Sequence, residues 1–154
     1  MSTGMKPSNF RRLINLWPPY LLNSIRVQSI ARDWSEARVV LHLRPWNRNI
    51  VGTQFGGNLF AMIDPMPMLL AMRQLGAQYH VWDKAAEIDF VAPGRNHVYA
   101  TIRMPASAID EIRSAARTGD KVLRWSDIDI CHADGSPVAH VRKQLYVRLK
   151  SQHR

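Results

Sequence analysis

The segment from Gly57 to Met72, GNLFAMIDPMPMLLAM, is apolar on every side when it is drawn as a helix. Only Asn58 and Asp64 within it are polar. A helix that is apolar all round has to be enclosed by other parts of the molecule. A single curved sheet covers only one side of such a helix. We therefore expect a homo-oligomer, in which a second copy of the chain covers the remainder.

The segments on either side of this helix alternate between apolar and polar residues, as half-buried strands do. The hairpin expected across the turn Pro93–Gly94 joins the strands 81–92 and 97–104. Strands gathered around one long helix indicate an α+β domain with a largely antiparallel sheet. We expect a single domain over residues 1–154, with a short N-terminal helix at about 9–17 and a basic C-terminal tail. The other expected strands are 25–30, 37–44, 122–131 and 138–149.

The net charge of +9 favours an anionic partner: a phosphorylated small molecule, nucleic acid or anionic lipid. The basic residues are scattered, so a nucleic-acid-binding arm is not expected. The lone Cys131 excludes an intrachain disulfide, and the six histidines lack the spacing of metal ligands. No apolar run reaches the roughly 20 residues needed to span a bilayer. We expect a cytoplasmic protein without a metal.

Asp64 is the only carboxylate in the most apolar segment of the chain. A buried carboxylate has to be paired, neutralised or reached by water through a pocket. Pro65 cannot donate a hydrogen bond to the carbonyl of Ala61, so we expect the helix to kink there. Two interpretations remain open. Asp64 is either a functional acid in a pocket, or one half of an ion pair with Arg or Lys that locks an interface.

Gly56 and Gly57 stand at the start of the same helix. Glycines there let another molecule approach the backbone, and the free N–H groups can polarise a carbonyl and hold an oxyanion. Asp64 lies seven residues after Gly57, at about 10 Å of helix rise. The acid therefore either comes from the helix of a partner subunit or acts on a group bound along the helix. The alternative is a tight loop-to-helix turn with no chemical role.

The stretch NIVGTQFGGNLFAMID, residues 49–64, resembles the motif of hotdog-fold thioesterases of the phenylacetyl-CoA thioesterase type. VWDKAAEIDFVAPGR, residues 81–95, resembles the strand and Pro-Gly turn that follow the motif. Residues 10–149 are more similar still to a thioesterase-like branch described as a domain of unknown function. The resemblance implies a hotdog fold, a curved antiparallel sheet wrapped around one long central helix. It also implies a dimer or a dimer of dimers, with active sites at the dimer interface.

The resemblance further implies hydrolysis of an acyl-CoA thioester. Asp64 would activate water or attack the thioester, Gly57 would bind the carbonyl through its N–H, and Asn49 would position water or substrate. Coenzyme A would be part of the substrate, so no separate cofactor is expected. Phe55 stands where these enzymes usually have His. That departure favours an alternative, a non-catalytic protein that binds acyl chains or acyl-CoA.

Further residues are expected to contact the substrate. Gly56 and Phe55 would lie at the mouth of the pocket, and Phe60 and Met68 at its acyl end, where flexible Met suits a variable chain. Arg95 and Arg103 would contact the phosphates of coenzyme A. For Phe60 and Met68 the alternative is plain core packing. For the two arginines it is solvated surface charge.

Overall fold

The computed structural model describes residues 4–151. It confirms the α+β class. The helices are α1 (Pro7–Leu16), α2 (Pro18–Leu22), α3 (Gly56–Ile63), α4 (Met66–Leu75) and α5 (Ala106–Ala116). The strands are β1 (Ile25–Ile30), β2 (Glu36–Leu41), β3 (Tyr79–Phe90), β4 (Val98–Arg103), β5 (Val122–Cys131) and β6 (Pro137–Leu149). In the basic tail, β6 extends as far as Leu149, and residues 152–154 lie outside the described range.

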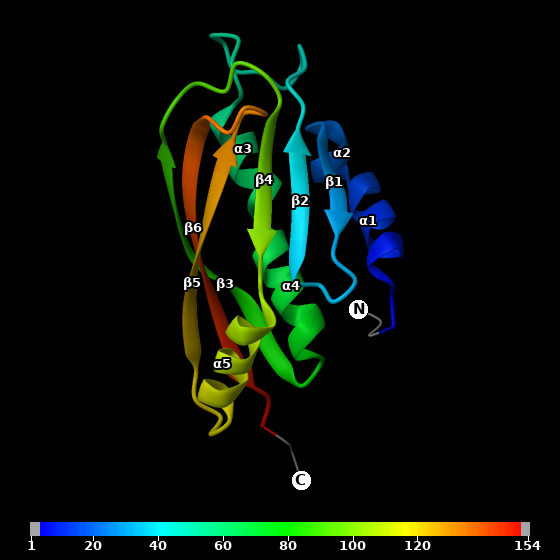
Figure 1. Cartoon of the computed structure of the whole chain (residues 1–154), viewed down its shortest axis with the longest axis vertical. Coiled ribbons are helices and arrows are strands. Elements are labelled where there is room, and N and C mark those ends of the chain that lie inside the picture. Colours follow the sequence, from blue (N-terminus) through cyan, green and yellow to red (C-terminus); the bar gives the residue numbers. More distant parts are fainter. Residues whose placement is uncertain (1–3, 152–154) are drawn as a thin grey trace.

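The six strands form one antiparallel sheet in the order β1-β2-β4-β5-β6-β3. The sheet curves around α3 and α4, which follow one another along its inner face (Figure 1). The alternation of apolar and polar residues along the strands explains why the inner face of the sheet is apolar. In β4, for example, Val98, Ala100 and Ile102 are buried, because successive side chains of a strand point to opposite faces.

The hairpin expected between 81–92 and 97–104 is wrong. β3 pairs with β6 over its full length, from Tyr79 opposite Leu149 to Phe90 opposite Ala139. After the Pro93–Gly94 turn the chain instead crosses the end of the molecule, and β4 pairs with β2 and β5 (Figure 1). A turn signal shows only that the chain reverses. The long alternating strand β6 offers β3 a full-length partner, and β4 offers only six residues.

The central helix is divided in two at Asp64 and Pro65, the position at which a kink was expected. Pro65 has no N–H, so the i→i−4 ladder is interrupted there. The phenol of Tyr20 then donates a hydrogen bond of 2.9 Å to the carbonyl of Met62, at the end of α3. Tyr20 is almost completely buried. A side chain from α2 therefore stabilises the interruption of the helix.

The two helices bury one side against the sheet and leave the other partly open. Residues of the inner side, including Leu59, Met62, Met66 and Leu70, are buried. Phe60, Asp64, Met68 and others on the outer side are only half-buried. A helix that is apolar all round is thus covered on one side by its own chain.

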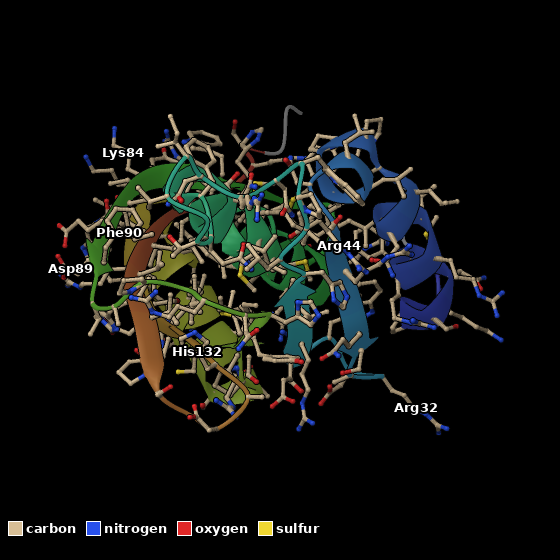
Figure 2. All side chains as sticks on the ribbon, turned by 90° about the horizontal axis from the view of Figure 1, so that it is seen from above. Arg32, Arg44, Lys84, Asp89, Phe90 and His132 are labelled. Atoms are coloured by element: carbon tan, nitrogen blue, oxygen red, sulfur yellow. The ribbon has the colours of Figure 1, made fainter. Side chains whose placement is uncertain are left out.

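The two edges of the sheet differ. β1 is flanked by α1 and α2, whereas β3 has no neighbouring strand on its outer side in the described chain (Figure 1). Figure 2 shows Lys84, Asp89 and Phe90 along this open edge, on the side of the molecule away from α1. Among the described residues, no helix is long and apolar enough to cross a membrane.

Candidate active site

The break between α3 and α4 carries a buried ion pair. The ammonium of Lys143, from β6, donates a hydrogen bond to Oδ1 of Asp64. Strand alternation places Lys143 on the inner face together with Val141 and Leu145, and its side chain is only 2% exposed. The ring of Phe60, one turn before Asp64, lies 5.2 Å from the lysine Nζ. A buried cation is therefore aimed at the end of α3.

A second carboxylate, that of Asp83 in β3, approaches the same lysine. Its Oδ1 lies 3.1 Å from Lys143 Nζ. The β3–β6 register shifts between Asp83 and Ala85, so a bulge in β3 lies at this point. Burial raises the pKa of Asp83, and the neighbouring lysine opposes that effect. One ammonium thus faces two carboxylates that differ in environment.

Tyr20 completes this group on the side of α2. Burial, followed by the negative charge of Asp64, raises the pKa of the Tyr20 phenol. The phenol therefore keeps its proton at neutral pH and remains a hydrogen-bond donor to the backbone of α3. Its role in the structure is to fix the end of the helix from which Asp64 projects.

The ion pair expected for Asp64 is present, and a catalytic role for this residue stays a prediction. The carboxylate is paired, with a lysine, and its side chain is also 45% exposed. Lys143 binds Oδ1, and within residues 4–151 no partner occupies Oδ2. A carboxylate held through one oxygen and open at the other can accept a proton from water or attack an electrophile.

Asn49 organises the loop that leads into α3. Its Oδ1 accepts hydrogen bonds from the N–H groups of Val51 and Thr53, and its Nδ2 donates to Thr53 Oγ1 at 2.9 Å. Both ends of the amide are thus used within the loop. The loop runs beside the Pro93–Gly94 turn, where Gln54 N–H donates to the Gly94 carbonyl.

Gly56 and Gly57 lie between two aromatic rings. A Cβ on Gly56 would come within 3.0 Å of the Phe90 ring, and one on Gly57 within 2.5 Å of the Phe55 ring. The first hydrogen bonds of α3 are donated by Asn58 and Leu59 to the Phe55 carbonyl, so the two glycine N–H groups precede the ladder. Both rings belong to exposed side chains that can move aside, and the two glycine N–H groups lie outside the helix ladder, where they can bind an acceptor.

A cavity of about 430 Å³ opens at this helix start. It brings together Asn49 and Gly56 with the 90–94 turn of the chain. Phe55 is exposed at its side chain and Arg95 follows the turn at the surface. The lining residues are Asn49, Thr53, Gln54, Gly56, Leu59 and 90–94.

The other predicted site residues lie elsewhere. Asp64 is at the opposite end of α3 from Gly57. Arg103 is at the far end of β4 from Arg95 and pairs with Glu36 at 3.3 Å. Met68 lines a separate apolar groove between α1 and α4. One protomer therefore does not bring all nine predicted residues together, and the two arginines lie at opposite ends of β4.

Sequence reasoning missed three residues of the group at the break: Lys143, Asp83 and Tyr20. A signal for Lys143 exists, because it occupies an inward position in the alternation of Val141, Leu145 and Val147. No group of three or more metal-ligating side chains occurs in the part of the chain that the structure describes.

Comparison with known proteins places the chain in a family. Residues 8–147 match the family described as "Domain of unknown function (DUF4442)". The chain belongs to the DUF4442 family. No curated protein matches its sequence.

Solved structures resemble this DUF4442 chain over nearly its whole length. A Pseudomonas aeruginosa protein of unknown function, described as a probable thioesterase, is 17% identical with a TM-score of 0.84, covering 94% of this chain and 97% of that one. A Haemophilus influenzae thioesterase is 14% identical (TM-score 0.69; coverage 97% and 96%). The Escherichia coli PaaI protein from the phenylacetic acid degradation operon is 18% identical (TM-score 0.65; coverage 94% and 93%). The predicted hotdog fold is confirmed.

Proposed function

We propose that this protein hydrolyses an acyl-CoA thioester and that the carboxylate of Asp64 acts as general base or nucleophile. The observation that carries the proposal is the half-exposed carboxylate at the helix break, held by a buried lysine through one oxygen only. The carboxylate is also accessible to the water that the reaction consumes. The thioesterase-like structural neighbours support the same reaction class.

In the proposed reaction Oδ2 of Asp64 takes a proton from water while the water oxygen attacks the thioester carbonyl. The negative charge on the carbonyl oxygen is stabilised by the Gly57 N–H at the positive end of α3. Collapse of the intermediate breaks the C–S bond, and coenzyme A leaves as the thiolate. Direct attack by Asp64 on the carbonyl, followed by hydrolysis of the anhydride, uses the same residues.

Asp64 and Gly57 stand at opposite ends of α3, so this mechanism assigns them to different copies of the chain. β3 offers twelve residues of unpaired edge for that copy. We propose that two β3 strands pair across a twofold axis to form a dimer, and that a dimer of dimers is built on it. Asp64 of one protomer then faces the helix start of the other. Asn49 shapes the loop there, and in this proposal Arg95 contacts the phosphates.

The alternative is a non-catalytic acyl-CoA binding protein. It is favoured by the ring of Phe55, which lies against Gly57 where a thioester carbonyl would have to approach. An acyl-binding protein keeps the cavities and does not need access to that amide.

A panel of acyl-CoA esters, assayed for release of free thiol, separates the two. Hydrolysis that is lost in Asp64→Asn supports the enzyme. Binding of acyl-CoA without thiol release supports the alternative. Light scattering of the purified protein tests the dimer, since a mass of 17.6 kDa, that of one chain, contradicts it.

A further inference from the structure

An apolar groove of about 590 Å³ lies between α1 and α4. We call it the α1–α4 groove. All its lining side chains are apolar: Phe10, Leu13, Ile14, Leu16, Trp17, Pro18, Pro65, Met68 and Leu69. Its volume falls within the roughly 300–1,000 Å³ of small-molecule sites. Because its lining is almost entirely apolar, it suits hydrocarbon better than the phosphates or adenine of coenzyme A.

Two lining residues of the groove are neighbours of the group around Asp64. Pro65, which lines the groove, is the residue next to Asp64. On the other wall, the ring of Trp17 lies 5.7 Å from the ring of Tyr20. Tyr20 in turn is bonded to the end of α3 and is affected by the charge of Asp64. The groove therefore reaches the helix break, one residue from Asp64.

The composition of the walls also suits a flexible ligand. Met68 is unbranched and adapts to irregular shapes. Leu13, Leu16 and Trp17 are exposed at the rim, although burying such side chains is favourable. A ligand that covers these side chains removes apolar surface of the groove, as well as its own, from water.

We propose that the α1–α4 groove binds the acyl chain of the substrate and that this chain is a long, unbranched aliphatic one. The assignment of a substrate, as opposed to a bound ligand, rests on the function proposed above. The groove then selects by chain length, because each buried methylene contributes about 0.8 kcal/mol, which is about fourfold in affinity.

The test uses S-hexyl-CoA and S-decyl-CoA, thioethers that cannot be hydrolysed. Calorimetry on the whole protein should show that S-decyl-CoA binds about 10-fold to 200-fold more tightly than S-hexyl-CoA. The upper value corresponds to four fully buried methylenes. Met68→Trp places a larger side chain in the groove and should remove most of that difference. Leu22→Trp is the matched control, because Leu22 is exposed on α2 outside the groove. Thermal unfolding establishes that both variants are folded.

Three other results have distinct meanings. Equal affinity for the two thioethers overturns the inference. So does a Met68→Trp variant that changes the oligomeric state and leaves the chain-length dependence intact, because a second copy then covers the groove. Chain-length-dependent binding that Met68→Trp abolishes, together with no hydrolysis of the corresponding thioesters, upholds the groove and removes the proposed enzyme.

Discussion

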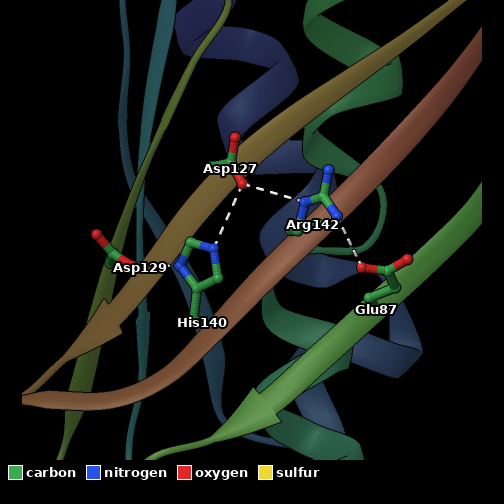
Figure 3. A network of polar contacts seen from close by, with 5 residues as sticks. All are labelled: Glu87, Asp127, Asp129, His140 and Arg142. Atoms are coloured by element: carbon green, nitrogen blue, oxygen red, sulfur yellow. Dashed lines mark hydrogen bonds and ion pairs between the residues drawn. The ribbon is translucent and has the colours of Figure 1, made fainter.

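Lys143 and Arg142 are neighbours in β6, yet they belong to different electrostatic environments on the two faces of the sheet. On the outer face Arg142 joins a group that we call the outer-face network: Glu87, Asp127, Asp129, His140 and Arg142 (Figure 3). On the inner face Lys143 alone meets Asp64 and Asp83. In both groups carboxylates outnumber the Lys or Arg side chains that they face. The groups differ in the exposure of the cation, because Arg142 is exposed to water and Lys143 is buried.

The outer-face network is built from exposed groups. Arg142 contacts Glu87 at 3.0 Å and Asp127 at 3.5 Å, and its guanidinium stacks 4.8 Å from the ring of Trp125. His140 lies between Asp127 and Asp129, at 3.3 and 2.7 Å. Ion pairs of this kind contribute about 0–1 kcal/mol each, because water and salt screen them.

Lys143, Asp64 and Asp83 form the inner group. Around the buried ammonium of Lys143, water and salt screen charges only weakly. A lysine withdrawn from water needs its partners, and removing them leaves a costly buried charge. The difference between the two faces indicates that the outer-face network is a surface feature and that the inner group fixes the position of the carboxylate proposed to be catalytic.

Asp64→Asn gives the largest expected effect. General-base catalysis contributes about 10²–10⁴-fold, so kcat for a cleaved acyl-CoA should fall by that amount while the dimer persists. Asp127→Asn, on the outer face, is the matched control and should leave kcat within about twofold. Equal losses in the two variants would remove the functional distinction between the faces.

Lys143→Met and Arg142→Met compare adjacent positions directly. Losing a buried partner costs about 3–5 kcal/mol when both ions are enclosed. Because Asp64 and Asp83 reach water, we expect about 1–3 kcal/mol for Lys143→Met in urea unfolding. Arg142→Met should cost less than about 1 kcal/mol. In Lys143→Met kcat should fall more than KM changes, since the lysine touches the acid and not the substrate.

Asp83→Asn sharpens the difference between the two inner carboxylates. Burial raises the pKa of Asp83 above its ordinary value of 3.8, so the ionised form is disfavoured in the folded protein. That penalty is absent below pH 3.8 and develops as pH rises through the folded-state pKa. At pH 7 the variant should be as stable as the native protein or slightly more so. The advantage should disappear near pH 3 in unfolding experiments, and a large loss at pH 7 would show that Lys143 depends on both carboxylates.

His140→Asn gives the smallest expected effect. The hydrogen bond to Asp129, with the charges of Asp129 and Asp127, raises the pKa of His140. The histidine therefore stabilises the fold fully below its unfolded pKa of about 6.5, and this contribution is lost as pH rises through the folded pKa. Native and variant proteins should differ by less than about 1 kcal/mol at pH 5.5 and converge at pH 9. A difference that grows with pH contradicts the assigned pairing.

The sequence predicted the local features better than the distant ones. Pro65 made the break in the central helix predictable, and the alternation of apolar residues located all six strands. The wrong hairpin between 81–92 and 97–104 concealed the pairing of β3 with β6. That pairing places Asp83 opposite Leu145 and Ala86 opposite Lys143.

The site illustrates the same limit. Asp64, Gly57 and Asn49 fall within one motif, so their presence was visible in a short window. Lys143 is 79 residues from Asp64, and nothing in a strand pattern states which helix its side chain will meet. The inward position of Lys143 predicts a buried charge. Its partner depends on strand register and on the position of the interruption between α3 and α4.

The place of β6 in the sheet has a consequence for synthesis on the ribosome. β6 is the last strand to emerge, and it is inserted between β5 and β3, which are already translated. Until then β3 has no neighbour on either side, and Asp64 has no ammonium beside it. Closure of the sheet and completion of the charged site are thus a single late event. A nascent chain that stops before residue 137 has neither.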